Sequence, residues 1–132
     1  MPHQIKKIET EKAPRAIGPY SQATSSNGFI FVSGQLPIDP ITNELVKGNI
    51  QTLTNRVLDN LEAILHASGC GFNDVVRVDV FLTDLSKDFA DMNAEYAKRF
   101  NSSVPPARQT IQVSALPKGA SIEMSCIAVK GK

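Results

Sequence analysis

The fold is decided by residues 49–83, which read NIQTLTNRVLDNLEAILHASGCGFNDVVRVDVFLT. In the first part, apolar residues recur at the spacing of one helical face: Ile50, Leu53, Val57, Leu61, Ile64 and Leu65. Asn49 is a typical N-cap and Gly69 a typical stop, which predicts a helix over residues 49–68. In the second part, Val76, Val78, Val80 and Leu82 alternate with Arg77, Asp79, Phe81 and Thr83. This alternation predicts a strand with unlike faces.

Further elements are predicted on both sides of this stretch. Before it, residues 21–26 and 29–34 flank Asn27-Gly28, a dipeptide that favours a tight hairpin turn. Residues 36–48 contain Pro37 and Pro40 and are expected to form a loop. After it, Ser86 is the expected cap of a second helix that ends near residue 100, with its core stripe at Phe89, Met92, Tyr96 and Phe100. Residues 108–115 and 121–129 are expected to form a final hairpin, joined through residues 116–120.

This order of hairpin, helix, strand, helix and hairpin predicts a single α+β domain over residues 1–132. We expect a mixed, mainly antiparallel sheet of five or six strands, with both helices on one face. Two strands would fill the other face with Arg77, Asp79, Phe81, Thr83, Arg108, Thr110, Gln112 and Ser114. Such a mixture of polar and apolar side chains is typical of a subunit interface, so we expect an oligomer.

The composition limits the classes of function. Fourteen basic and thirteen acidic residues give a net charge of +1, with no basic cluster of the kind that binds nucleic acid. The amino terminus, Met1–Lys7, lacks the apolar core of a signal peptide, and no apolar run is long enough for a membrane span. These features predict a soluble, cytoplasmic protein. Cys70 and Cys126 are too few and unpatterned for a metal site, and no cofactor motif is present.

Two charged residues are the first candidates for a functional site. Arg108 follows Pro105 and Pro106, and its guanidinium matches a carboxylate with two parallel hydrogen bonds. Glu123 lies on the next expected strand and could accept a proton or position a water molecule. The alternative is an ordinary surface ion pair. A symmetric hairpin centred on Lys118 would place Arg108 and Glu123 on opposite faces of the sheet. An odd register, a bulge or another route to a common cleft remain open.

Several stretches together resemble the RidA (YjgF) family of reactive-intermediate deaminases. They are residues 16–23 (AIGPYSQA), 31–37 (FVSGQLP), Asn93, residues 106–108 (PAR), 116–119 (LPKG) and 122–123 (IE), and they cover nearly the whole chain. The resemblance implies a chorismate-mutase-like fold and a homotrimer with clefts between subunits. It also implies, without a cofactor, hydrolysis of 2-imino acids such as 2-iminobutanoate and 2-iminopropanoate, and of their enamine tautomers, to 2-oxo acids and ammonia.

The same resemblance implies roles for individual residues. Arg108 would clamp the substrate carboxylate, and Glu123 would position water or move a proton. The substrate would also be contacted or enclosed by Tyr20, Ser33, Gly34, Asn93 and the backbone around Thr110. Thr110 departs from better-known bacterial members, which carry Cys there, so a mechanism that needs a thiol at this position is excluded.

Two other functions compete with imine hydrolysis. A trimer that binds 2-oxo acids and regulates a partner would use the same Arg108. A ribonuclease or translation inhibitor is disfavoured by the near-neutral charge.

Overall fold

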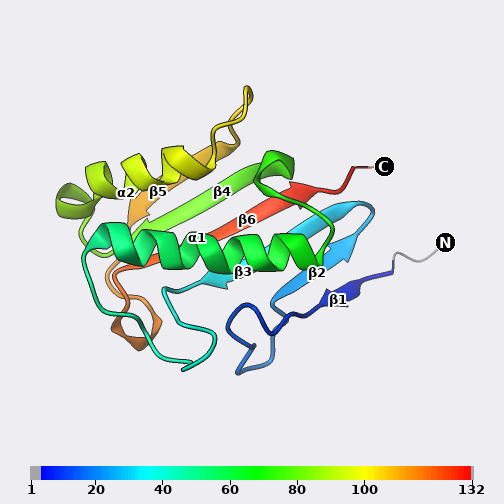
Figure 1. The fold of residues 1–132 in the computed structure, drawn as a ribbon, viewed down its shortest axis with the longest axis horizontal. Helices are drawn as coiled ribbons and strands as arrows, with labels where there is room; N and C mark the ends of the chain where they lie inside the picture. The colour runs from blue at the N-terminus through cyan, green and yellow to red at the C-terminus, as the bar shows by residue number, and fades with distance from the viewer. Residues whose placement is uncertain (1–3, 132) are drawn as a thin grey trace.

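One six-stranded sheet and two helices build the molecule (Figure 1). The computed structural model describes residues 4–131, so Met1–His3 of the amino-terminal stretch and Lys132 lie outside the description. The strands are β1 (Lys6–Ile8), β2 (Ala23–Ser26), β3 (Phe29–Gln35), β4 (Val75–Leu82), β5 (Ala107–Gln112) and β6 (Ile122–Val129). The α-helices are α1 (Ile50–Ala67) and α2 (Leu85–Arg99), and the short 3-10 turns are η1 (Phe72–Asp74) and η2 (Pro117–Gly119). No helix among them is both long and apolar enough to cross a bilayer.

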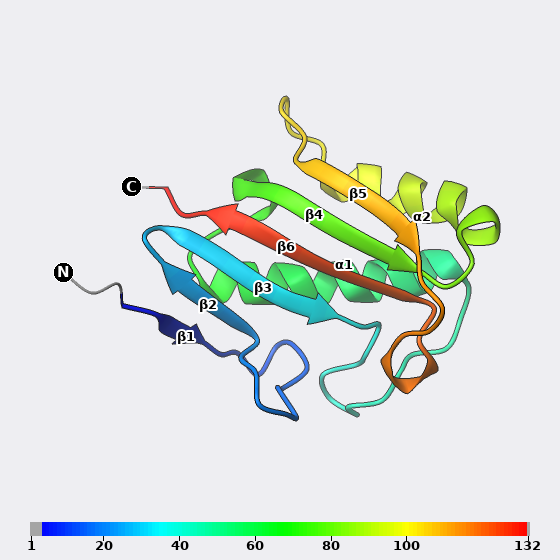
Figure 2. The same ribbon diagram turned by 180° about the vertical axis from the view of Figure 1, so that it is seen from behind.

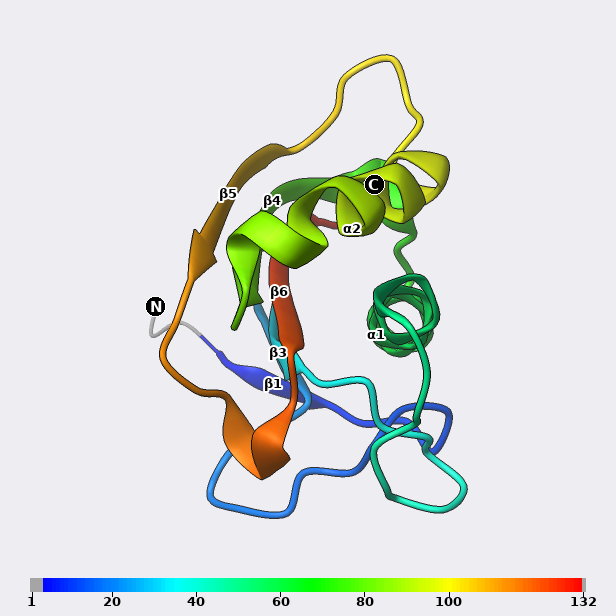
Figure 3. The same ribbon diagram turned by 90° about the vertical axis from the view of Figure 1, so that its left-hand side faces the viewer.

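The strand order is β1-β2-β3-β6-β4-β5, and β4–β5 is the parallel pair in an otherwise antiparallel sheet. Because β6 is antiparallel to both β3 and β4, these two strands run in the same direction. α1 therefore connects β3 to β4, and α2 connects β4 to β5, as two successive crossovers that move the same way across the sheet. Such crossovers are nearly always right-handed, which puts both helices on one face (Figures 1 and 3). The prediction of a mixed sheet with two helices on one face is confirmed.

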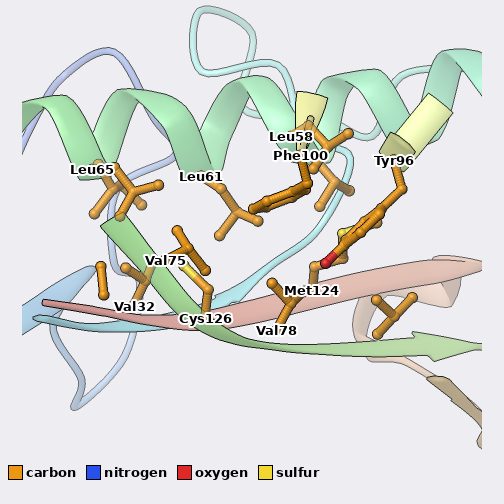
Figure 4. Packing of buried hydrophobic residues seen from close by; sticks show 14 of the residues in the cluster. Val32, Leu58, Leu61, Leu65, Val75, Val78, Tyr96, Phe100, Met124 and Cys126 are labelled. Carbon is orange, nitrogen blue, oxygen red and sulfur yellow. The ribbon is translucent and has the colours of Figure 1, made fainter. Parts of the chain in front are cut away.

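The core lies between the helices and this face of the sheet (Figure 4). From α1, Leu58, Leu61 and Leu65 are fully buried, and they pack over Val78, Met124 and other side chains of β4 and β6. Full burial of one such side chain contributes about 1.5–3 kcal/mol, so this layer is the main source of stability. The other face carries no helix (Figure 2).

The first predicted elements are confirmed with small changes. Asn27 and Gly28 have φ angles of 53° and 81°, as a tight hairpin turn requires, and Ser26 pairs with Phe29. The Asn49 side chain accepts a hydrogen bond from the Thr52 N–H at 2.9 Å and caps α1. The cap of α2 is Asp84 rather than Ser86, because the Asp84 carboxylate accepts the Lys87 N–H at 3.2 Å.

Two expected core residues are not in the core. Val75 pairs with Ala128 and Arg77 with Ile127, so β4 has one extra residue there and bulges. Val75 takes the buried position, and Val76 is 46% exposed. On α2, Met92, Tyr96 and Phe100 of the predicted stripe are buried, but Phe89 is 38% exposed.

The predicted final hairpin is wrong. β5 pairs with β4, and β6 lies on the other side of β4, between β4 and β3. The chain leaves β5 after Gln112 and passes through η2 before it enters the middle of the sheet. Val113 therefore does not pair with Glu123; its N–H donates to the Leu82 carbonyl at 2.9 Å.

Candidate active site

A pocket of about 500 Å³ collects four of the predicted site residues, Tyr20, Ser33, Gly34 and Glu123. Its walls come from the loop between β1 and β2, the end of β3, the loop between β3 and α1, η2 and the start of β6. These segments are distant in the sequence, and the sheet brings them together because β3 and β6 are hydrogen-bonded neighbours. Its size is in the range of small-molecule sites.

Glu123 is the charged group on the sheet side of this pocket. It lies on β6 between Ile122 and Met124, which are fully buried on the helix side, so Glu123 faces the side of the sheet without helices. Burial raises the pKa of its carboxyl group above the ordinary value of 4.5. A carboxyl group with a raised pKa holds its proton to higher pH and can donate it as well as accept it.

Gly34 allows this carboxylate to lie directly over the backbone. The β3–β6 register runs from Val32–Cys126 to Gln35–Met124, so Ser33 and Gly34 together face one residue, Ser125. Because β3 bulges here, Gly34 lies next to the Glu123 carboxyl group of β6. A Cβ atom at position 34 would lie 2.7 Å from the carboxyl carbon of Glu123, a distance that real contacts do not reach. Any larger residue at position 34 would therefore clash with the Glu123 side chain, which explains the glycine.

Ser33 and Tyr20 line the pocket from the hairpin side. The Ser33 hydroxyl donates to the Ser21 carbonyl at 2.6 Å, and the Ser33 N–H donates to the Gln22 carbonyl at 2.9 Å. Ser33 thus fixes the entry to β2 through these bonds. Tyr20 is 53% exposed, so its ring is open to solvent or to a partner molecule.

Sequence reasoning missed two buried amides that hold the pocket walls. Gln22 is 3% exposed; its side chain accepts the Thr10 N–H at 2.7 Å and donates to the carbonyls of Thr10, Ala13 and Pro14 at 3.0, 3.3 and 2.8 Å. Asn60 on α1 is fully buried and donates to the carbonyls of Leu36 and Ile38 at 3.1 and 2.9 Å. An asparagine among the apolar positions of a helix was the available signal for the second.

Arg108 belongs to a different part of the molecule. It pairs with Val78, whose side chain is buried under the helices, so Arg108 also faces the helix side of the sheet. Its Nη1 donates to the Asn93 side-chain oxygen at 2.7 Å. The guanidinium carbon lies 4.6 Å from the centre of the Tyr96 ring and 5.9 Å from that of Phe89.

These contacts leave most of the guanidinium donors for another partner. Of the carboxylates in residues 4–131, none forms an ion pair with Arg108. A hydroxyl on the same strand, that of Thr110, is buried and has no hydrogen-bond partner in the described structure. The aromatic rings and Asn93 orient the arginine, and its remaining N–H groups can bind an anion.

The structure therefore does not bring all predicted site residues together. Arg108, Asn93 and Thr110 are not part of the pocket that holds Glu123. The expectation that Arg108, Thr110 and Gln112 occupy the face without helices is wrong, because their parallel pairing with Val78, Val80 and Leu82 turns them to the helix side; Ser114 lies beyond β5. Arg108 and Glu123 still lie on opposite faces, as the parity argument predicted, although the hairpin used in it does not exist.

Comparison with known proteins agrees with this architecture. Residues 10–130 match the family model described as Endoribonuclease L-PSP. A RutC family protein from Pyrococcus abyssi is 55% identical over 123 residues, covering 93% of this chain and 95% of the relative. The 2-iminobutanoate/2-iminopropanoate deaminase of Mus musculus is 46% identical over 126 residues, covering 96% and 92%.

The same relationship extends to solved structures. The crystal structure of RidA from an Antarctic Psychrobacter species superposes with a TM-score of 0.88 at 44% identity and covers 94% of this chain and 98% of that one. The matching model, the sequence relatives and the shared fold together show that this chain belongs to the RidA (YjgF) family, whose model is described as Endoribonuclease L-PSP.

Proposed function

We propose that the protein hydrolyses 2-imino acids and their enamine tautomers, such as 2-iminobutanoate and 2-iminopropanoate, to 2-oxo acids and ammonia. The observation that carries this proposal is the carboxyl group of Glu123, which lies over Gly34 in a small-molecule pocket and has a pKa raised by burial. Imine hydrolysis needs one group that gives and takes protons beside an electrophilic carbon, and this carboxyl group can do both. The mouse relative named as such a deaminase supports the same reaction.

The proposed working unit is a homotrimer. On the sheet face without helices, Phe29, Phe31, Ile111 and Val129 are each about 40% exposed, from 39% to 45%. Exposed apolar side chains on one face favour burial against another copy of the chain. A second copy docked on this face could bring its own Arg108 to the pocket that holds Glu123. The site would then be completed by two protomers, which accounts for the separation of the two residues within one chain.

In this site, the Arg108 guanidinium would bind the substrate carboxylate through two parallel hydrogen bonds. The protonated Glu123 carboxyl group gives its proton to the imine nitrogen, and the resulting carboxylate takes a proton from the water molecule that attacks C2. The new C–O bond forms as the C=N double bond becomes single. Glu123 then returns the proton to nitrogen and the C–N bond breaks. As ammonia leaves, the Glu123 carboxylate takes the proton of the new hydroxyl, which forms the 2-oxo acid and restores the protonated carboxyl group. An enamine enters this sequence after protonation at C3.

We do not extend the family description, Endoribonuclease L-PSP, to a proposal of RNA cleavage by this chain. The net charge is +1, and RNA binding of useful affinity depends on clustered cations that neutralise phosphates. The stacked pair Phe29 and Phe31 could offer bases an aromatic surface, but it lies on the face that we assign to contacts between copies.

The test measures release of 2-oxobutanoate and ammonia from 2-iminobutanoate, generated in the cuvette by an amino-acid oxidase. We expect the protein to accelerate hydrolysis, and Glu123→Gln to lower kcat by about 10²–10⁴-fold, the range for loss of a positioned acid–base group, with little change in binding of 2-oxobutanoate. Absence of acceleration by the folded wild-type protein would refute the proposed activity. A Glu123→Gln variant with unchanged kcat and weaker binding would assign Glu123 to binding instead.

A further inference from the structure

Two basic side chains line the pocket that holds Glu123, and neither has a counter-ion within residues 4–131. Arg15 comes from the loop between β1 and β2, and Lys118 comes from η2. Both side chains are exposed, and neither forms an ion pair with a carboxylate of the described part of the chain. The lining thus combines two cations with the single acid Glu123.

Lys118 is held in a backbone conformation that disfavours a side chain. Its φ and ψ angles are 60° and 15°, and the next residue, Gly119, has φ of 73°. Left-handed backbone costs free energy for any residue with a Cβ atom, so glycine or asparagine would be the less strained choice. The Gly119 N–H donates to the Leu116 carbonyl, and the Ala120 N–H donates to the Pro117 carbonyl, both at 3.2 Å, which closes the turn. A strained lysine in a braced turn beside a pocket points to a use for its charge.

The backbone next to Arg15 is also held by hydrogen bonds. The residue before it, Pro14, accepts a hydrogen bond from the buried Gln22 side chain at 2.8 Å, and Ala13 accepts another at 3.3 Å. The loop has no regular secondary structure of its own, so these bonds fix the point from which the arginine side chain extends. A fixed origin lowers the entropy lost when a long side chain binds a ligand.

The same pocket offers these cations, the Glu123 carboxyl group and an apolar wall. Apolar wall comes from Ile17, Leu36 and Ile38. A pocket that offers one acid, two unpaired cations and an apolar wall matches an imino acid with an aliphatic spacer and a second anionic group.

We infer that Arg15 and Lys118 bind an anionic group at the end of the substrate side chain, so that the pocket prefers 2-imino dicarboxylates of the 2-iminoglutarate type over 2-iminobutanoate. This inference rests on the proposed function, in which Arg108 of a second copy takes the carboxylate at C1. The reaction that supplies such a substrate is oxidation of the amine of an acidic amino acid.

The first experiment measures binding and does not depend on turnover. Calorimetry compares 2-oxoglutarate with 2-oxobutanoate for the wild type, Arg15→Gln, Lys118→Asn and the double variant. Asparagine at position 118 tolerates the left-handed backbone, so the turn is kept. We expect the wild type to bind 2-oxoglutarate about 5- to 20-fold more tightly, and each single substitution to reduce that preference about two- to five-fold, the range for partly exposed ion pairs. The matched control is Lys47→Gln, which removes an exposed charge outside the pocket and should keep the preference.

The second experiment measures kcat/KM for 2-iminoglutarate, generated by a glutamate oxidase, against 2-iminobutanoate. Both substitutions should lower the ratio of the two values, and added salt should lower it as well. Equal binding of the two oxo acids by the wild type, or a preference that survives the double substitution, would overturn the inference. If the substitutions lowered kcat/KM equally for both substrates, Arg15 and Lys118 would attract anions in general and not recognise the second anionic group. That result would also overturn the inference. If no imine is hydrolysed, the proposed function fails, while the binding comparison still decides the inference.

Discussion

At the scale of single residues, the site depends on how far Glu123 is removed from water. The unfolded chain releases the Glu123 proton near the ordinary pKa of 4.5, while the folded protein holds it to higher pH. As pH rises from below 4.5 through the raised pKa, the unfolded state is therefore favoured, and this loss of stability is complete above the raised pKa. At neutral pH, the buried Glu123 carboxyl group therefore lowers the free energy of unfolding.

Glu123→Gln should remove this pH-dependent cost. We expect the variant to melt at a higher temperature than the wild type at about pH 7–8 and at a similar temperature below about pH 4, where both side chains are neutral. Melting curves followed by circular dichroism across this range test the expectation. A difference in melting temperature that is constant with pH would show that the carboxyl group is not buried enough to titrate abnormally.

Gly34 is the second residue whose identity can be tested directly. In Gly34→Ala, the new Cβ atom would lie 2.7 Å from the Glu123 carboxyl carbon and would displace it, while the backbone at position 34 can accept alanine. Because a displacement of about 1 Å can cost 10²-fold in rate, we expect kcat to fall at least about ten-fold with the fold intact. Gly71→Ala is the control, since a Cβ atom there meets no atom within 4 Å. Equal activity of the two variants would contradict the steric role of Gly34.

At the scale of elements, the site depends on irregular segments that are fixed by buried amides. The loop between β1 and β2 contributes Arg15, Ile17 and Tyr20 to the pocket, and Gln22 replaces the hydrogen bonds that a strand partner would supply. The loop between β3 and α1 is held in the same way by Asn60. A buried amide that satisfies several backbone groups gives a loop one conformation without a regular element.

Gln22→Ala should therefore destabilise the protein. Loss of four hydrogen bonds at about 0.5–1.5 kcal/mol each predicts a decrease of about 2–6 kcal/mol in the free energy of unfolding, measured in urea. Proteolysis within residues 10–20 should become faster. Gln51→Ala on α1 is the control, with an expected change within about 0.5 kcal/mol. A Gln22→Ala variant as stable as this control would show that the loop is held by other contacts.

At the scale of the whole molecule, the separation of Arg108 from Glu123 predicts an active site shared between copies. Arg108→Ala and Glu123→Gln should each be nearly inactive alone. When the two variants are mixed by unfolding and refolding together, random assembly gives about a quarter of the sites both native residues if each site draws on two neighbouring protomers. We expect recovery of about this fraction of wild-type activity.

Each variant refolded alone is the control for this mixing experiment. Sedimentation of the mixture should show a trimer. No recovery of activity in a correctly assembled mixed trimer would place both residues of a working site in one protomer and contradict the shared cleft.

The sequence by itself determined the elements whose signals are local. The spacing of apolar residues and the Asn49 cap give α1, and Asn27-Gly28 gives the β2–β3 turn, because helix and turn geometry depend on residues within a few positions of each other. Arg108 and Glu123 do lie on opposite faces, but this agreement with the parity argument is coincidental, because β5 and β6 do not pair with each other. Family motifs marked Glu123 and Gly34, which the fold places in contact.

The tertiary structure alone decided which strands are neighbours and, through them, what the pocket contains. Two strands that are consecutive in the chain suggest a hairpin, but β6 lies in the centre of the sheet and not beside β5 at its edge. In the centre, Ile122 and Met124 are fully buried, and burial of apolar side chains stabilises this arrangement. That choice turns Arg108 under α2 and puts Glu123 beside β3. Contacts of this kind join residues far apart in the chain, and their free energy depends on the burial of the whole sheet, which no local pattern records.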